Sequence, residues 1–366
     1  MRFEVAVGGA TEPRAGTLTL GHGEVRTPAF MPVGTRGTVK AVDVEDLRRL
    51  EVEILLGNAY HLWRAPGPEA VAAAGGLHHW MGWKGNILTD SGGFQAVSLA
   101  RSGAARVHDG GIEFTDGDGA QRLTPELAIE VQERLAPDIM MALDHPLDFP
   151  ATAAGVAVAT ERTHRWADRC AAAWSRGRTE LFGIVQGGFD PGARAQSAGA
   201  IRDIGFPGYG IGGLSLGESP ELSRELTLAV NAVLEPDKPR YLMGVGSEPE
   251  ILAAIDAGVD LFDCVWPTRL ARTGAILVGA GRLNIRRHAL ADDHGPLEAG
   301  CACPACARHS RAQVRYLFMR GELLGHRLLT MHNLHHILEL VRQARAAILA
   351  GGYAEFVIRR LDRIPA

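Results

Sequence analysis

The chain has 366 residues, of which 46% are hydrophobic and 22% are charged. This composition excludes intrinsic disorder, because disordered chains have too few aliphatic residues to build a core. The first residues, MRFEVAVGGATEPRAG, do not form a charged start followed by an apolar signal core, and no run of 18 apolar residues occurs in the sequence. We therefore expect a cytoplasmic protein that does not enter a membrane.

The net charge of −4 is distributed unevenly along the chain. From Trp266 to the end there are 15 Arg and no Lys against seven Asp and Glu, a balance of +8, so the first 265 residues carry −12. This asymmetry indicates an anionic partner for the C-terminal third, because Arg makes bidentate contacts with phosphate. A solvated helical surface would give the same count, so charge alone leaves both interpretations open.

Eight short apolar runs recur along the chain, each ending near a small or polar residue. They are AFMPV (29–33), ILLGN (54–58), ILTD (87–90), IMMALD (139–144), LFGIVQ (181–186), YGIGGL (209–214), YLMGVG (241–246) and LFDCV (261–265). Segments with helix-start signals lie between them, for example at 124–136, 219–234 and 247–258. This alternation predicts an α/β fold, a closed (β/α)8 TIM barrel. An open doubly wound sheet is the alternative, although no GxGxxG loop follows the first run.

Polar residues and glycines gather where these runs end, which in such barrels is the catalytic side. They are Asn58, Asp90, Asp144, Gln186, the backbone of 212–214, Gly244 and Asp263. Each one alone could be a helix cap or a turn residue. Aspartates in one pocket repel one another when ionised, which separates a proton donor from a nucleophile, as glycosidic bond chemistry requires. A glutamine beside a glycine-rich backbone suits a planar nucleobase, so we expect a nucleoside substrate.

The sequence CACPAC places Cys301, Cys303 and Cys306 within six residues. Three thiolates and a fourth protein ligand would close a zinc ion to substrate, which predicts a structural site. Spacing alone does not choose the fourth ligand among His309, His326, His332, His335 and His336. A helix capped by Thr330 would place His332 in its first turn, facing the thiols.

Several longer motifs resemble those of the bacterial tRNA-guanine transglycosylases. ILTDSGGFQ, IVQGG, GIGGLSLGE, RYLMGVG, DLFDCVWPTR and CACPAC followed by LLTMHNL occur in the same order, and the resemblance runs from about Thr17 to Phe356. It implies a barrel core with N-terminal strands and loop insertions in residues 1–280. A zinc-binding subdomain and C-terminal helices in residues 281–366 would be packed on the barrel as one structural unit.

The resemblance also implies an activity. Such enzymes exchange the wobble guanine of GUN anticodons, in the tRNAs for Asp, Asn, His and Tyr, for 7-aminomethyl-7-deazaguanine in queuosine biosynthesis. Because the sugar keeps its configuration, two inversions and a covalent ribosyl-aspartate are required. The expected partners are the tRNA anticodon stem-loop, the 7-deazaguanine base and a second copy in a homodimer.

Residue roles carry over by position. Asp263 would be the nucleophile and Asp90 the general acid and base. The base would be bound by Asp144, Gln186, the amide of Gly213, the carbonyl of Leu214 held by Glu218, and the bordering residues Ser91, Phe94, Met243 and Gly244. Arg269, Arg272, Arg286 and Arg287 would contact RNA, and one structural Zn²⁺ would be held by Cys301, Cys303, Cys306 and His332.

Some positions depart from the family pattern and leave base and tRNA preference open. His145 and Pro146 follow Asp144 where Glu and often Cys are usual, and Trp266, Leu270 and Arg36 also differ. Leu216 would crowd the large queuine base, which favours the aminomethyl base over a queuine-salvaging activity. A metal-dependent barrel hydrolase has little support, since only His61 and His145 lie near run ends. A non-catalytic tRNA-binding subunit is disfavoured because both Asp90 and Asp263 are retained.

Overall fold

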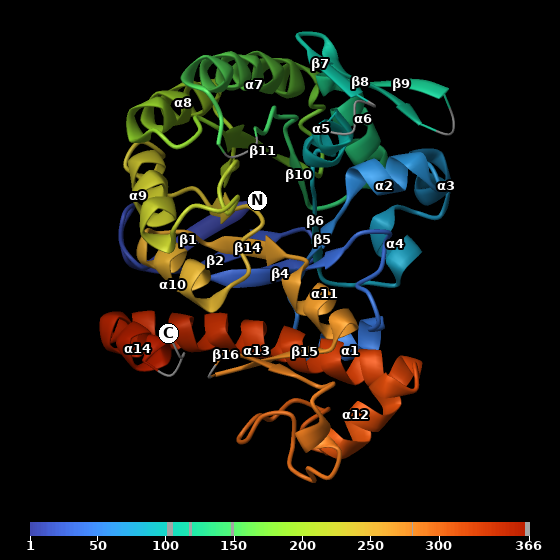
Figure 1. The fold of residues 1–366 in the computed structure, drawn as a ribbon. Coiled ribbons are helices and arrows are strands. Elements are labelled where there is room, and N and C mark those ends of the chain that lie inside the picture. The colour runs from blue at the N-terminus through green and yellow to red at the C-terminus, as the bar shows by residue number, and fades with distance from the viewer. Residues whose placement is uncertain (101–104, 117–118, 148–149, 280, 363–366) are drawn as a thin grey trace.

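The computed structural model describes residues 1–100, 105–116, 119–147, 150–279 and 281–362. Eight parallel strands close into a barrel in the order β4, β5, β6, β10, β11, β12, β13, β14 (Figure 1). They are β4 (Ala29–Gly34), β5 (Ile54–Gly57), β6 (Asn86–Thr89), β10 (Ile139–Met141), β11 (Glu180–Val185), β12 (Gly208–Ile211), β13 (Arg240–Leu242) and β14 (Leu261–Cys264). Each of the eight predicted runs contributes one strand, so the TIM barrel is confirmed.

The barrel interior is filled by alternate side chains of its strands. Ile139 and Met141 of β10 pack there with Phe182 and Ile184 of β11, all of them buried. The intervening residues, such as Met140, belong to a second core between the strands and the surrounding helices. Because both faces of every strand are buried, the strands have the continuous apolar runs seen in the sequence.

Three of the helices that surround the barrel begin at the start signals predicted from the sequence. The hydroxyl groups of Thr124, Ser219 and Ser247 accept hydrogen bonds from backbone N–H groups in the first turns of α6, α9 and α10. The helices of the barrel are α1 (Val44–Arg49), α2 (Ala59–Arg64), α3 (Pro68–Ala73), α4 (Leu77–Met81), α5 (Gly93–Ala100), α6 (Pro125–Leu135), α7 (Ala153–Ala173), α8 (Pro191–Ile204), α9 (Pro220–Asn231), α10 (Glu248–Asp256) and α11 (Trp266–Thr273).

Two small antiparallel sheets are added to the barrel. The first precedes it and consists of β1 (Arg2–Val7), β2 (Ala15–Leu20) and β3 (Gly23–Thr27). The second is inserted between α5 and α6 and consists of β7 (Ala105–His108), β8 (Gly111–Asp116) and β9 (Gly119–Leu123). No continuous apolar run marks this second sheet in the sequence, because apolar and polar residues alternate in β7 (ARVH) and β8 (GIEFTD).

The C-terminal part consists of the hairpin β15 (Ala275–Val278) and β16 (Gly281–Asn284), the 3₁₀ turn His288–Leu290, and the helices α12 (Arg311–Met319), α13 (Leu323–Leu349) and α14 (Tyr353–Leu361). Helix α13 packs against α11, α12, β15 and β4, so this part lies directly on the barrel (Figure 1). The predicted boundary between residues 1–280 and residues 281–366 falls within this hairpin, because its two strands pair on either side of residue 280. That division stays a prediction.

The predicted start of the long C-terminal helix was wrong. Helix α13 begins at Leu323 after the N-cap residue Glu322, so Thr330 lies in its interior and is not a cap. Leu328 and Leu329 upstream of Thr330 are buried and continue the apolar face of the same helix. Within the part of the chain that the structure describes, no helix is both long and apolar enough to cross a membrane.

Candidate active site and metal centre

Asp90 follows the last residue of β6 and lies at the rim formed by the carboxyl ends of the barrel strands. The side-chain amide of Asn58 donates to its Oδ2 at 2.6 Å, and the N–H of Ala59 donates to its Oδ1 at 2.8 Å. Burial raises the pKa of Asp90 to about 7, the hydrogen bond from Ala59 opposes this rise, and the charge of Asp263 adds to it. Near neutral pH this carboxyl group is therefore able both to give and to take a proton.

Asp263 lies in β14, on the same face of the strand as Leu261 of the barrel interior. Its Oδ1 accepts hydrogen bonds from the hydroxyl of Tyr241 at 2.5 Å and from the N–H of Gly244 at 2.8 Å. Burial raises the pKa of Asp263, and these two hydrogen bonds oppose the rise. Its other oxygen, Oδ2, receives no hydrogen bond from any residue that the structure describes. The orienting role of Tyr241 has no signal in the sequence.

Asp144 and Gln186 form a buried pair between the ends of β10 and β11. The side-chain amide of Gln186 donates to Oδ2 of Asp144 at 2.7 Å. Burial raises the pKa of Asp144 to about 6, and the hydrogen bond from Gln186 opposes the rise. The loop after Asp90 closes over this pair, since a Cβ atom at Gly93 would lie 3.2 Å from Oδ1 of Asp144. The structure thus brings the two predicted base-reading side chains together.

The backbone at Gly212 and Gly213 also contacts Gln186. A Cβ atom at Gly212 would lie 2.6 Å from its Nε2, and one at Gly213 would lie 2.4 Å from its Oε1, so a side chain at either position would displace that of Gln186. The buried guanidinium of Arg194 donates to the carbonyls of Gly212 at 3.0 Å and Gly213 at 3.2 Å. Because a trans peptide points its C=O and N–H in opposite directions, the amide of Gly213 faces away from Arg194.

The peptide between Leu214 and Ser215 is also held from one side. The carboxylate of Glu218 accepts hydrogen bonds from the N–H of Ser215 at 2.5 Å and the N–H of Leu216 at 2.9 Å. The carbonyl of Leu214 belongs to the same peptide as the N–H of Ser215, so it points away from Glu218. Arg194 lies in the first turn of α8 and was not among the predicted site residues, because its partners at Gly212 and Gly213 come from a separate loop.

The remaining predicted pocket residues lie on the same strand-end loops. Ser91 is buried and its hydroxyl accepts a hydrogen bond from the N–H of Gly93 at 3.2 Å. Phe94 in the first turn of α5 is half exposed, and Met243 packs against the barrel interior. Gly244 has φ +79°, and its N–H contacts Asp263. Their contacts with a base stay predictions.

His145, which departs from the family pattern, is half-buried. Burial and the charge of Arg162 together lower its pKa to about 4, which favours the neutral imidazole near neutral pH. The guanidinium of Arg162 donates to Nδ1 of His145 at 3.2 Å, which places the ring proton on Nε2. His145 lines the same pocket as Gln186 and Gly213, so it lies beside the Asp144–Gln186 pair.

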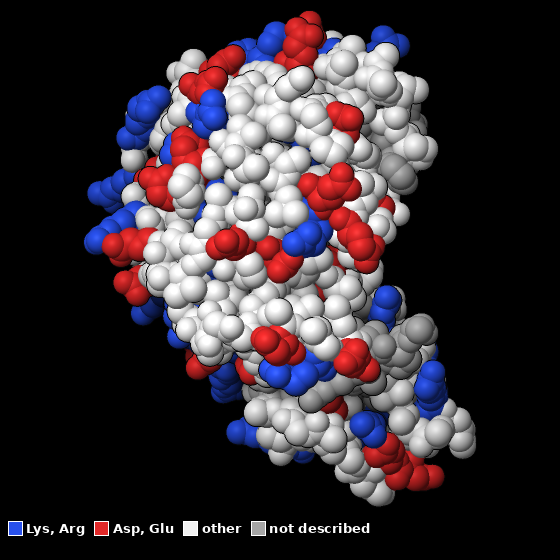
Figure 2. Space-filling view, turned by 90° about the vertical axis from the view of Figure 1, so that its left-hand side faces the viewer, with Lys and Arg blue, Asp and Glu red and all other residues white. Residues whose placement is uncertain are grey.

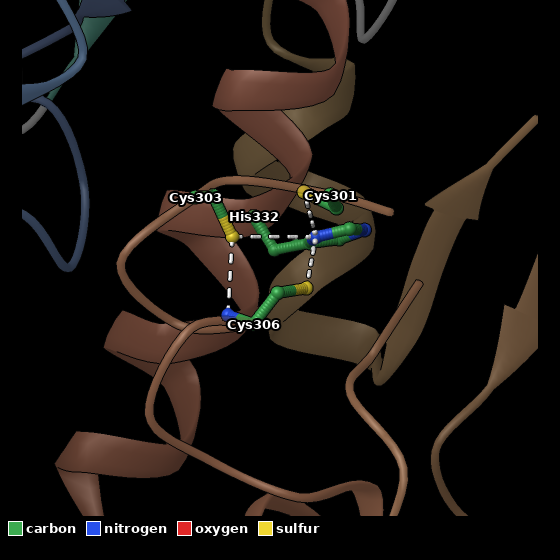
Figure 3. Close-up of side chains that lie close together, drawn as sticks. All are labelled: Cys301, Cys303, Cys306 and His332. Carbon is green, nitrogen blue, oxygen red and sulfur yellow. Dashed lines mark hydrogen bonds between the residues drawn. The ribbon is translucent and has the colours of Figure 1, made fainter. Parts of the chain in front are cut away.

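Three thiols and one imidazole form the predicted metal cluster (Figure 3). Nδ1 of His332 lies 3.6 Å from Sγ of Cys301, 3.6 Å from Sγ of Cys303 and 3.4 Å from Sγ of Cys306. Nε2 of His332 lies 2.7 Å from the carbonyl oxygen of Leu277, a contact that leaves Nδ1 free to bind a metal. This geometry selects His332 among the five candidate histidines, and a closed Cys₃His set fits structural zinc.

The four arginines predicted to contact RNA follow the last barrel strand. Arg269, Arg286 and Arg287 are exposed, whereas Arg272 is half-buried and donates to the carbonyl of Thr268 at 2.9 Å. On the face of the molecule drawn in Figure 2, acidic and basic side chains are interspersed and form no continuous basic area. The RNA contacts therefore stay predictions.

Comparisons with known proteins agree on one family. The profile of the family described as queuine tRNA-ribosyltransferase matches residues 10–366. The chain is similar to proteins with that name from Desulforudis audaxviator (strain MP104C), with 50% identity covering 92% of this chain and 91% of the relative. It is also similar to those of Nitratidesulfovibrio vulgaris (strain DP4), with 48% identity covering 97% and 95%, and Synechococcus sp. (strain CC9311), with 45% identity covering 97% and 95%.

Proposed function

The chain belongs to the queuine tRNA-ribosyltransferase family and is a pentosyltransferase, and from this premise we propose the reaction and its steps. The proposed reaction exchanges the wobble guanine of GUN anticodons for 7-aminomethyl-7-deazaguanine, in queuosine biosynthesis. The two bases leave and enter on the same face of the ribose, so the reaction proceeds by double displacement through a covalent intermediate.

The observation that carries this proposal is the contrast between the two rim carboxylates. The carboxyl groups of Asp263 and Asp90 both have raised pKa values, but they accept hydrogen bonds in different ways. Asp263 accepts both of its hydrogen bonds on Oδ1 and leaves Oδ2 free for attack, whereas both oxygens of Asp90 accept hydrogen bonds. A free oxygen suits a nucleophile, and a carboxyl group with a pKa near 7 suits a proton shuttle.

In the first step, Oδ2 of Asp263 bonds to C1′ of the ribose as the C1′–N9 bond of guanine breaks. Asp90 gives its proton to the departing base. In the second step, the incoming base loses the corresponding proton to Asp90 and bonds to C1′, which releases the carboxylate of Asp263. Water must be excluded meanwhile, because hydrolysis of the intermediate would leave an abasic tRNA.

The base is proposed to bind between the Asp144–Gln186 pair and the glycine loop. A carboxylate accepts from the donors on the pyrimidine edge, while Gln186 and the amide of Gly213 donate to the carbonyl oxygen. The carbonyl of Leu214, oriented by Glu218 through Ser215, would accept from the aminomethyl group. Peptides fixed by Arg194 and Glu218 provide donors and acceptors that need no reorganisation on binding.

The tRNA is proposed to present its wobble base extruded from the anticodon loop, where unstacking costs only a few kcal/mol. Arg269, Arg286 and Arg287 are exposed beyond the last strand and would contact phosphates, with Arg272 beside them. The zinc ion would be structural, since its ligands lie on α13 and on the loop before α12, and not at the rim. A tRNA substrate also places the enzyme in the cytoplasm.

A homodimer is proposed as well. Where α12 meets α13, Tyr316, Met319, Leu323 and Leu324 expose between 44% and 82% of their surface to solvent. Apolar groups gathered in this way are typical of interfaces, and a second copy would cover them.

The proposal is tested with unmodified tRNA and radiolabelled guanine. Wild-type enzyme should place label in the tRNA, and a tRNA–enzyme adduct should survive on a denaturing gel. Asp263→Asn should incorporate label at least about 10⁴-fold more slowly and form no adduct, because it lacks the nucleophile. The surface variant Asp203→Asn serves as control and should match wild type. Undiminished exchange by Asp263→Asn would refute the mechanism.

Base preference needs a separate measurement. Leu216 lies on the loop held by Glu218, and its side chain would crowd the cyclopentenediol of queuine. Competition between the two bases should therefore favour the aminomethyl base, and Leu216→Gly should shift the ratio toward queuine. Faster incorporation of queuine by wild type would instead identify a salvage enzyme.

A further inference from the structure

At the end of the barrel opposite to the rim, three side chains from distant segments converge. Asp138 immediately precedes β10, His78 lies in α4, and His22 lies in the turn between β2 and β3. Nδ1 of His22 is 2.7 Å from Oδ1 of Asp138, and Nε2 of His78 is 3.1 Å from Oδ2 of the same carboxylate. The proposed reaction uses none of these residues.

We propose that His22, His78 and Asp138 form a second metal site, separate from the Cys₃His cluster, for a divalent transition metal such as Zn²⁺. One ligand atom from each residue lies within 4.8 Å of the other two. Two imidazoles and one carboxylate are a common ligand set for zinc, whose bonds of about 2.0–2.2 Å would place neighbouring ligand atoms roughly 3.3 Å apart. The two nitrogen-to-oxygen separations, 2.7 Å and 3.1 Å, would each need to widen by roughly half an ångström at most.

Two of the ligands are fixed and the third is able to move. The side chains of His78 and Asp138 are buried, and Oδ2 of Asp138 also accepts a hydrogen bond from the N–H of Ile87 at 2.9 Å. That backbone contact holds the carboxylate as an outer-shell partner would. The side chain of His22 is 42% exposed and lies between Gly21 and Gly23, so the metal would enter from its side.

Metal binding requires one defined rearrangement. The rings of His22 and His78 are stacked, with centroids 3.6 Å apart and planes inclined by 18°. A metal ion binds in the plane of an imidazole ring, so the ring of His22 must turn out of the stack while His78 stays in place. The ion then replaces the N–H protons that now point at Asp138, and it balances the negative charge of that carboxylate.

The position of this site indicates what it would do. Residues at the amino-terminal end of a barrel contribute to stability and not to chemistry. A bound ion would tie the β2–β3 hairpin to α4 and to the start of β10. It would also leave one coordination position open to solvent, so binding should be weaker than at the closed thiolate cluster.

The test uses the full-length, zinc-loaded protein, titrated with ZnCl₂ in a calorimeter, followed by desalting and metal analysis. Wild type should bind a second equivalent beyond that of the thiolate cluster, and His22→Ala should bind it at least ten-fold more weakly. His79→Ala removes the adjacent histidine of α4, which is exposed and not part of the cluster, and should bind as wild type does. Base exchange should be unchanged in both variants.

A second variant separates metal binding from ring packing. His22→Phe keeps a ring to stack on His78 but has no nitrogen ligand, so it should retain the wild-type melting temperature without zinc and lose the second equivalent. The proposal is overturned if wild type holds a single equivalent, or if His22→Ala and His22→Phe bind the second one as tightly as wild type. The first outcome would leave the cluster as a hydrogen-bonded contact only.

Discussion

The rim of the barrel and the Cys₃His cluster both bury ionisable groups away from water. They differ in whether the buried negative charge is balanced by a positive one. At the rim, burial raises the pKa values of Asp90, Asp144 and Asp263, and no cation among the described residues forms an ion pair with them. At the cluster, the charges of the thiolates would be balanced by a metal ion.

The different treatment of buried charge indicates the role of each region. Buried carboxylates without a counter-ion destabilise the folded chain, and such a cost persists where the charge is used in a reaction. Thiolates neutralised by zinc stabilise the structure around them and are closed to substrate. Changes in the cluster should therefore affect folding first, and changes at the rim should affect catalysis first.

The largest effect is expected from a zinc ligand. Cys306→Ser should reduce the metal content from one zinc per chain to nearly none, because a structural site contributes on the order of 10 kcal/mol of metal-binding free energy. The segment from 301 to 332 should lose protection from proteolysis. Metal analysis and limited proteolysis measure both effects, and His309→Ala, at a histidine outside the cluster, is the control. A Cys306→Ser protein with full zinc content would show that the cluster is not the metal site.

A smaller effect, on catalysis alone, is expected from Gly213→Ala. Its Cβ atom would lie 2.4 Å from Oε1 of Gln186, so the side chain that contacts Asp144 must move. A displacement of this size should lower kcat/KM by about 100-fold, with zinc content unchanged. Gly205→Ala has the same backbone strain, with φ +87° against +68°, but its Cβ meets nothing within 4 Å. If both variants lose activity equally, strain and not the contact with Gln186 is responsible.

The sequence predicted the residues at the rim better than the buried residues that orient them. Strand ends repeat along a barrel, so Asp90 and Gln186 could be identified from their position at the ends of apolar runs, and Asp263 from its position within the last run. Arg194 and Tyr241 could not, because a buried arginine in a helix and a tyrosine in a strand have no local pattern that names their partners. The start of α13 was misplaced because Thr330 has the residue type of a cap, whereas buried Leu328 and Leu329 continue the helix past it.

A third effect is expected on the pH dependence of catalysis. In the proposed mechanism Asp263 is ionised when it attacks and Asp90 is protonated when guanine leaves, so kcat/KM should rise with pH as Asp263 loses its proton. It should fall about ten-fold per unit above pH 7, where Asp90 loses its own. Gln95→Met removes a hydrogen bond that lowers the pKa of Asp90, so the alkaline limb should move to higher pH. A profile that is flat from pH 6 to pH 9 would contradict these roles.

The smallest effect is on stability, and it has the opposite sign to a zinc-ligand change. Because burial raises the pKa of Asp263, the folded chain binds this proton more tightly than the unfolded chain, and its contribution to stability falls as the pH rises through the folded pKa. Asp263→Asn keeps an oxygen for Tyr241 and Gly244 and places its amide where Oδ2 was free. Thermal unfolding at pH 8 should therefore show the variant more stable by a few degrees, with a smaller difference at pH 5.

Asp90→Asn is the matched comparison, because both oxygens of Asp90 accept hydrogen bonds and an amide would place a donor against Asn58 or Ala59. It should gain less stability at pH 8 than Asp263→Asn, or lose some. If Asp263→Asn is no more stable than wild type at pH 8, burial of this carboxylate costs the fold nothing. Other interactions at the rim would then offset the free energy of burying the carboxylate charge, as a metal ion would at the Cys₃His cluster. The raised pKa values of the rim carboxyl groups would need a cause other than desolvation.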